Sequence, residues 1–67
     1  MTQLSARFQS TALSFAEYDT ESEQLEITFT SGQSYTFERV PQNIFEALRD
    51  AGSPGSYYHQ NIKGRYG

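Results

Sequence analysis

The chain has 67 residues, no cysteine and a formal net charge of −3. This length allows one domain with a small core, and the lack of cysteine excludes disulfides, thiolate zinc sites and a thiol nucleophile. The negative charge argues against generic phosphate-backbone binding, which relies on many Lys and Arg side chains.

The aromatic content and the N-terminal sequence indicate the class of protein. Five Phe and five Tyr make up 15% of the chain, and each can remove about 150–250 Å² from water, so we expect most of them in the core. The N-terminus lacks the basic and apolar regions of a signal peptide, and no stretch approaches the roughly 20 apolar residues that span a bilayer. We therefore expect a cytoplasmic protein with no membrane association.

Charge is unevenly distributed along the chain. Residues 1–16 carry a net charge of +1, residues 17–50 carry −6, and residues 51–67, which contain no acid, carry +2. Such polarity can give a small domain two faces of opposite sign, or it can simply keep the protein soluble. We prefer the second explanation, because surface charges are usually solvated.

The first half of the chain predicts three strands. Residues 1–9 are polar and unpatterned apart from Leu4 and Phe8, and we expect them to form a loosely ordered N-terminal arm that can become the start of the first strand. Residues 10–19 alternate, contain aromatics and end in a polar cluster, which predicts the first strand and its hairpin loop. Apolar and polar residues alternate strictly over residues 25–30, which predicts the second strand with one face in the core. After a short turn in which Gly32 can adopt a positive φ angle, residues 34–39 resume the alternation and predict a third, antiparallel strand.

The last third of the chain predicts two helices. Pro41 can occupy the first turn of a helix, apolar residues then follow at helical spacing, and Gly52 marks the stop. Ser53 and Pro54 form a second pair of N-cap and first-turn residues, so we expect a short second helix that ends at about residue 62.

These elements predict an α+β fold in the order βββαα, as a single domain over residues 1–67. A three-stranded antiparallel β-meander is covered by the first helix and is followed by a short second C-terminal helix. The first helix would cover the apolar residues of the hairpin, Leu25, Ile27, Phe29, Tyr35 and Phe37. Both edges of such a sheet are open to a partner strand or to a second copy, so we expect a monomer or a weak homodimer.

Several short motifs occur in a fixed order along the chain: Ser10-Thr11-x-Leu13, Tyr18-Asp19, Ser31-Gly32-x-x-Tyr35-x-Phe37, Val40-Pro41, Ala51-Gly52-Ser53 and Gly55-Ser56-Tyr57-Tyr58, followed by Ile62 and Tyr66. Their order resembles the KTSC domain family over about residues 10–66. The family takes its name from the C-terminus of some lysyl-tRNA synthetases and also occurs as stand-alone bacterial and phage proteins of this size.

The resemblance implies no defined activity, but it suggests RNA binding through the association with a tRNA-charging enzyme. Three positions depart from the family pattern. Phe37 replaces the second tyrosine of a Tyr-x-Tyr motif, so a role that needs that hydroxyl is in doubt, whereas packing or stacking is not. Glu17 stands where a glycine is common, and His59 where an asparagine is usual.

The acid-free end of the chain supplies a candidate nucleic-acid-binding surface. Cations that neutralise phosphates and aromatic side chains that stack on bases are the two requirements of single-strand binding. The candidate residues are Arg39, Tyr57, His59, Lys63, Arg65 and Tyr66. The alternative is structural: Tyr58 and Ile62 hold the second helix to the core, while Lys63 and Arg65 favour the negative end of its dipole.

Two further motifs have a structural explanation that we prefer. Tyr35 and Phe37 could stack on bases, but the alternation places both on the core face of the hairpin, beside Ile27. The segment 53–56 could bind an anion at a helix start, but a capping role explains Ser53 without any ligand.

No catalytic or metal-binding residues are predicted, and no cofactor is expected. His59 is the only histidine, and a triad of Ser53 or Ser56 with His59 and Glu46 or Asp50 would rest on sequence proximity alone. The acidic run Asp19, Glu21 and Glu23 lacks the glycine and closing glutamate of a calcium-binding loop. We therefore expect a non-enzymatic binding module, with RNA or a tRNA-associated assembly as its partner. The alternative is a protein-interaction or regulatory domain that acts through an exposed sheet edge.

Overall fold

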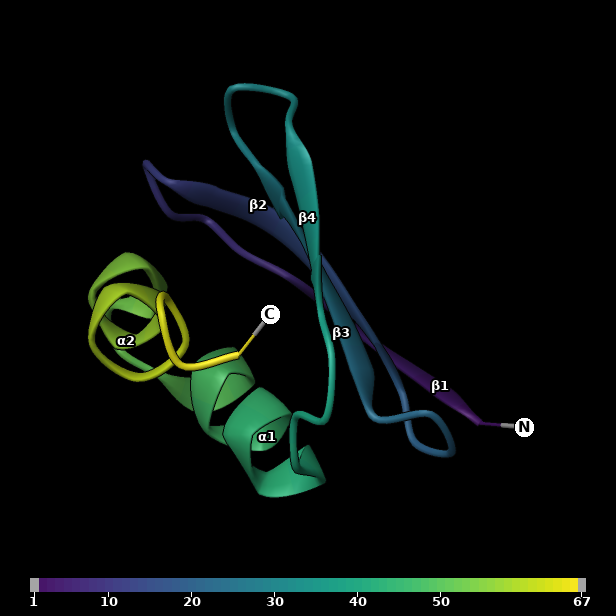
Figure 1. The fold of residues 1–67 in the computed structure, drawn as a ribbon. Helices are drawn as coiled ribbons and strands as arrows, with labels where there is room; N and C mark the ends of the chain where they lie inside the picture. The colour runs from purple at the N-terminus through teal and green to yellow at the C-terminus, as the bar shows by residue number, and fades with distance from the viewer. Residues whose placement is uncertain (1, 67) are drawn as a thin grey trace.

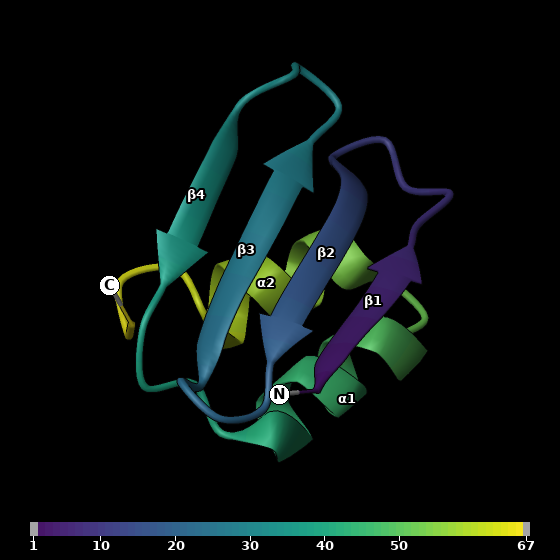
Figure 2. The same ribbon diagram turned by 90° about the vertical axis from the view of Figure 1, so that its right-hand side faces the viewer.

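A four-stranded antiparallel sheet carries both helices on one of its faces (Figure 1). The computed structural model describes residues 2–66. In chain order the elements are β1 (Gln3–Arg7), β2 (Leu13–Asp19), β3 (Gln24–Phe29), β4 (Ser34–Phe37), α1 (Gln42–Asp50) and α2 (Pro54–Asn61). The strands lie in the order β1-β2-β3-β4, so each pairs with its neighbour in sequence, as Figure 2 shows.

The expectation of three strands was wrong, because the predicted N-terminal arm forms β1 at the edge of the sheet. Leu4 pairs with Tyr18 and Ala6 with Ala16, and both β1 side chains pack against the core while remaining partly exposed. Only these two small or medium apolar residues mark the strand in the sequence. The strand is held in place by its hydrogen bonds to β2. A pattern of only five residues does not show that this pairing occurs.

The predicted meander of the next three strands is confirmed, with a β-bulge near the start of β2. Leu13 pairs with Phe29, but Phe15 pairs with Thr28, so one extra residue lies on β2 between the two pairs. β4 ends at Phe37, two residues before the predicted end, and Arg39 has a left-handed backbone with φ of 59°.

Both predicted helices are present, but their ends differ in detail from the prediction. Pro41 is the N-cap residue of α1, and Ala51, in an extended conformation, ends the helix one residue before Gly52. Ser53 is the N-cap residue of α2, as predicted, yet its hydroxyl makes no capping bond. It donates instead to the hydroxyl of Ser56 at 3.1 Å, so a side-chain cap does not explain Ser53. Within the described part of the chain, neither helix is long and apolar enough to cross a membrane.

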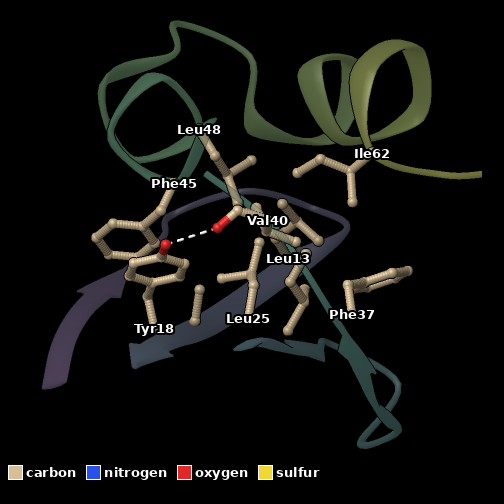
Figure 3. Close-up of a cluster of buried hydrophobic side chains, with 10 residues drawn as sticks. Leu13, Tyr18, Leu25, Phe37, Val40, Phe45, Leu48 and Ile62 are labelled. Atoms are coloured by element: carbon tan, nitrogen blue, oxygen red, sulfur yellow. Dashed lines mark hydrogen bonds between the residues drawn. The ribbon is translucent and has the colours of Figure 1, made fainter. Parts of the chain in front are cut away.

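The core forms between the sheet and the two helices (Figure 3). The Tyr18 ring stacks on the Phe45 ring of α1, with centroids 5.5 Å apart and an interplanar angle of 14°. The Tyr18 hydroxyl donates a 2.6 Å hydrogen bond to the Val40 carbonyl oxygen, so the one polar group of this buried side chain has a partner inside the core. Among residues 2–66 the largest fully buried side chains are apolar apart from that hydroxyl: Tyr18, Phe45, Leu13, Leu25, Ile27, Leu48, Ile62 and Val40.

The two helices share the sheet face that the first helix alone was expected to cover. α1 contributes Phe45 against Tyr18 of β2. α2 contributes Tyr58, whose ring lies 5.1 Å from Phe29 of β3 and 5.9 Å from Phe37 of β4, measured between centroids. The second helix is therefore part of the core and brings the C-terminal residues beside β4, as Figure 2 shows.

Candidate nucleic-acid interface

An open groove of about 540 Å³ lies between the β3–β4 hairpin and α2. Its size is within the range of small-ligand sites, about 300–1,000 Å³. We call it the aromatic groove. It is lined by Ala12, Phe29, Thr30, Ser31, Gln33, Tyr35, Phe37, Tyr58 and Lys63.

Four aromatic rings form one wall of the aromatic groove. Phe29 lies at the centre, with its ring edge-to-face against Tyr35 at 5.5 Å and against Tyr58 at 5.1 Å. Phe37 extends the cluster through an edge-to-face contact of 5.9 Å with Tyr58. Edge-to-face pairs are a favoured arrangement of aromatic rings, so the wall is ordered without a ligand.

Tyr35 is the exposed member of this wall. Among residues 2–66 it is the only large hydrophobic side chain that is exposed, at 51%. Its hydroxyl donates to Oε1 of Gln33 at 3.0 Å, and both residues line the groove. An exposed aromatic ring is suited to stacking on a planar ligand.

The prediction that Tyr35 and Phe37 both belong to the core is confirmed only for Phe37, which is 8% exposed. Tyr35 pairs with Ile27 and therefore lies on the core face, as predicted. It is nevertheless exposed, because β4 is the edge strand and its ring contact is with Phe29 alone. Alternation predicts which face a side chain occupies but not whether a helix covers it.

Lys63 adds a positive charge to the aromatic groove at the end of α2. Its backbone N–H donates to the Tyr58 carbonyl oxygen at 2.9 Å, which places the residue beside the rings. The Tyr58 phenol is uncharged at neutral pH even at the ordinary tyrosine pKa of about 10, and burial, with a smaller contribution from the neighbouring Tyr35, raises this pKa further. The groove thus combines neutral aromatic surface with one cation.

A second hollow, of about 400 Å³, lies at the other end of β4. It is lined by Glu38, Arg39, Arg65 and Tyr66, and we call it the arginine hollow. The Nε of Arg65 donates to the Gln60 carbonyl oxygen at 3.3 Å. Two arginines from separate parts of the chain therefore line the same hollow.

The structure brings together only part of the predicted nucleic-acid surface. Arg39, Arg65 and Tyr66 share the arginine hollow, and Lys63 lies in the aromatic groove. Tyr57 is half-buried and packs against the core, and it lines neither hollow.

The remaining predicted residue, His59, is exposed on α2 and lines neither hollow. The sequence reasoning missed Phe29, Gln33 and Tyr58 as site residues and treated Tyr35 as core. One feature of the sequence could have indicated that Tyr35 is exposed. This residue lies three residues after the turn glycine Gly32, and therefore near the end of the hairpin.

The residues of the hypothetical triad have other partners. Ser53 and Ser56 bond to each other, Glu46 accepts from Gln42 at 2.9 Å, and Asp50 pairs with Arg49 at 3.0 Å. Arg49 lowers the pKa of Asp50, chiefly through the hydrogen bond, so this carboxylate is a poor base. Across residues 2–66, no three His, Asp or Glu side chains gather where they could hold a metal ion.

The chain is similar to known proteins over most of its length. The KTSC domain model matches residues 9–66. An uncharacterized protein of Stutzerimonas stutzeri is 40% identical over 55 residues, which cover 82% of this chain and 78% of that protein. A lysine–tRNA ligase of Trichormus variabilis is 37% identical over 49 residues, which cover 73% of this chain but only 9% of the ligase.

A solved structure shares the fold. The crystal structure of a KTSC domain protein from Yersinia pestis superimposes with a TM-score of 0.89 at 25% identity, covering 97% of this chain and 92% of that one.

Proposed function

The chain belongs to the KTSC domain family, and from this membership and the site geometry we propose that it is a non-enzymatic module that binds unpaired RNA in the aromatic groove. The observation that carries the proposal is the pairing of Tyr35, which is 51% exposed, with Lys63 in one groove. Stacking of a base on an aromatic ring contributes about 1–3 kcal/mol in single-strand-binding proteins. A cation beside the ring can neutralise the phosphate that joins two stacked bases.

The relatives named lysine–tRNA ligase give the second line of support. The match covers 73% of this chain but only 9% of the ligase, so it concerns a small part of an enzyme whose name includes tRNA. The catalytic activity of the ligase is not carried over to this chain. What we carry over is the class of partner, an RNA with unpaired segments.

The charge of the protein limits how it can bind RNA. With a net charge of −3, the domain cannot rely on a broad basic surface, and long duplexes would meet more repulsion than attraction. Binding must therefore depend on stacking in the aromatic groove and on a few local cations. We expect modest affinity, strong sensitivity to salt and preference for single strands over duplexes.

The binding test compares two variants that make the same change in charge. Lys63→Gln removes the cation of the aromatic groove, whereas Arg7→Gln removes a cation from β1, which does not line the groove. With a single-stranded RNA of about six nucleotides, we expect Lys63→Gln to weaken binding about three-fold to ten-fold and to reduce the salt slope by about one. Arg7→Gln should leave both quantities unchanged.

Absence of binding to either the short strand or bulk tRNA at low salt would overturn the proposal, as would equal losses in the two variants. A stoichiometric protein partner that survives nuclease treatment would favour the rival function, strand addition at a sheet edge. That rival predicts that Lys63→Gln has almost no effect, because main-chain hydrogen bonds would carry the binding.

A further inference from the structure

We propose that the arginine hollow is a binding site for a phosphate group, held by Arg39, Arg65 and Tyr66. This phosphate site extends the proposed function in RNA binding. It rests on that function only where the phosphate comes from an RNA backbone. Binding of a free phosphate to the hollow can be measured without RNA.

The two arginines line one hollow because each lies close in sequence to a residue that is fixed in the core. Arg39 directly precedes Val40, which is fully buried. Arg65 follows Ile62, also fully buried, and its N–H donates to the Ile62 carbonyl oxygen at 3.0 Å. Figure 2 shows the C-terminal turn beside the end of β4. The backbone that carries each arginine is thus anchored by a buried neighbour.

The donors of both guanidinium groups are available to a ligand. No hydrogen bond or ion pair joins the Arg39 guanidinium to another group of residues 2–66. Arg65 uses its Nε on the Gln60 carbonyl oxygen, which leaves its terminal nitrogens free to bond. A guanidinium presents planar, forked N–H donors that match two oxygens of a phosphate. Two such groups with a tyrosine hydroxyl form a set of donors that favours a tetrahedral oxyanion.

The backbone of Arg39 is held in a conformation that an arginine rarely adopts. Its φ is 59°, in the left-handed region that disfavours side chains with a Cβ. The conformation persists because Val40 is bonded on both sides: its N–H donates to Glu23 O at 2.9 Å and its carbonyl accepts from Tyr18. Residues in such conformations concentrate at ligand sites when the surroundings hold them in place.

Glu38 lines the same hollow and opposes an anion. It makes no ion pair with either arginine among the described residues, so its carboxylate remains a source of repulsion. The hollow therefore carries two positive charges and one negative charge. This balance allows an anion to bind, and it predicts that removal of the Glu38 charge strengthens the binding, which a purely structural role for the hollow would not do.

The aromatic groove is lined by residues of β4, and the arginine hollow by the residues that directly follow this strand. Tyr35 and Phe37 line the groove, and Glu38 and Arg39 line the hollow. The backbone from Tyr35 to Arg39 spans at most about 13 Å at about 3.3 Å per residue. A stacked strand advances about 3.4 Å per nucleotide, so the distance suits about four nucleotides. One strand of RNA can place a base on Tyr35 and a nearby phosphate in the hollow.

The turn after α2 directs its cations to the two sites. Gly64, with φ of 79°, separates Lys63 from Arg65, and these neighbours line different hollows. A left-handed residue at this position reverses the chain locally, for which glycine is best suited. The same short turn therefore contributes one cation to each site, Lys63 to the aromatic groove and Arg65 to the arginine hollow.

The test follows the side-chain Nε–H signals of the arginines in ¹⁵N-labelled protein during titration with inorganic phosphate at constant ionic strength. We expect saturable shifts at Arg39 and Arg65 and none at Arg7. Arg39→Gly and Arg65→Gln should each weaken phosphate binding about three-fold to ten-fold, whereas Glu38→Gln should strengthen it about two-fold or more. Arg7→Gln serves as the matched control.

Any of three results would overturn the phosphate site. The shifts do not saturate, they occur equally at Arg7, or they are unchanged by Glu38→Gln and Arg65→Gln. The double variant Arg39→Gly/Arg65→Gln separates this inference from the proposed function. If it binds the RNA strand as well as the original chain does, the hollow holds no phosphate of the RNA, and RNA binding stands. If the original chain binds phosphate but no RNA, the site stands and the proposed function fails.

Discussion

The hydroxyl of Tyr18 donates a 2.6 Å hydrogen bond to the carbonyl oxygen of Val40, across the core from β2 to the connection between β4 and α1 (Figure 3). The same Tyr18 ring stacks on Phe45, and the N–H of Val40 donates to Glu23 O at 2.9 Å. One buried side chain thus joins three segments. Because Arg39 directly precedes Val40, this junction also fixes where the arginine hollow begins.

Removal of the Tyr18 hydroxyl should destabilise the domain without changing its packing. Tyr18→Phe leaves the Val40 carbonyl unsatisfied in the core, and we expect the free energy of unfolding to fall by about 1–3 kcal/mol. Urea unfolding monitored by circular dichroism measures this change. Tyr57→Phe, at a half-buried tyrosine whose hydroxyl makes no hydrogen bond within residues 2–66, should have little effect. Equal stability of Tyr18→Phe and the original chain would contradict the importance of the bond.

Stability should decrease at alkaline pH because of the buried tyrosines. Burial, followed by the charges of Glu23 and Asp19, raises the pKa of Tyr18 above its ordinary value of about 10. The phenol therefore titrates at a lower pH in the unfolded chain than in the folded protein. Its contribution is complete below about pH 10 and is lost as the pH rises further towards the folded pKa.

Thermal unfolding between pH 8 and 11 measures this dependence, with Tyr18→Phe as the comparison. The variant should be less stable at neutral pH, but its stability should fall less steeply above about pH 10. The same slope in both proteins would mean that Tyr18 does not carry the effect.

Glycine at position 39 should stabilise the fold. Arg39→Gly removes a left-handed cost of roughly 1–2 kcal/mol, and the greater freedom of glycine in the unfolded chain offsets about 0.5–1 kcal/mol of it. We expect a net gain of up to about 1.5 kcal/mol in chemical denaturation. The matched control is Arg49→Gly in α1, which should lose about 1 kcal/mol, because glycine is unfavourable in a helix. A loss of stability in Arg39→Gly would show that the Arg39 side chain contributes to folding.

Tyr35 and Phe37 should differ sharply in their contributions to stability, although both lie on the same face of β4. Tyr35→Ala removes a half-exposed ring that contacts Phe29, and we expect a loss of about 1 kcal/mol. Phe37→Ala empties a buried position, and its cost of about 3–5 kcal/mol should leave much of so small a domain unfolded. Similar losses in the two variants would show that Tyr35 is a core residue. The aromatic groove would then have no exposed ring on which a base could stack.

Local sequence patterns were sufficient to predict most of the fold. The strict alternation of β3 and the proline-led starts of α1 and α2 are local signals, and the structure contains all three elements. β1 could not be predicted in this way. Its two inward side chains, Leu4 and Ala6, are a weak pattern, and pairing with β2 supplies most of its order.

The candidate site was less predictable because it depends on contacts between distant parts of the chain. The sequence indicated that Lys63, Arg65 and Tyr66 form a basic, aromatic end, but not that Gly64 divides them between two hollows. Likewise, alternation placed Tyr35 on the correct face but could not show that α2 stops short of covering it. Those features follow from how the helices pack on the sheet, which no local pattern specifies.

The most direct test of RNA binding is an isotope-filtered NOE measurement on the labelled protein with an unlabelled single-stranded RNA of about six nucleotides. The proposed function predicts NOEs between base protons and the Tyr35 ring, accompanied by shifts at Lys63 that fade as salt is added. Saturating RNA that gives no NOE to Tyr35, with shifts confined to the open face of the sheet around Arg7, would contradict binding in the aromatic groove.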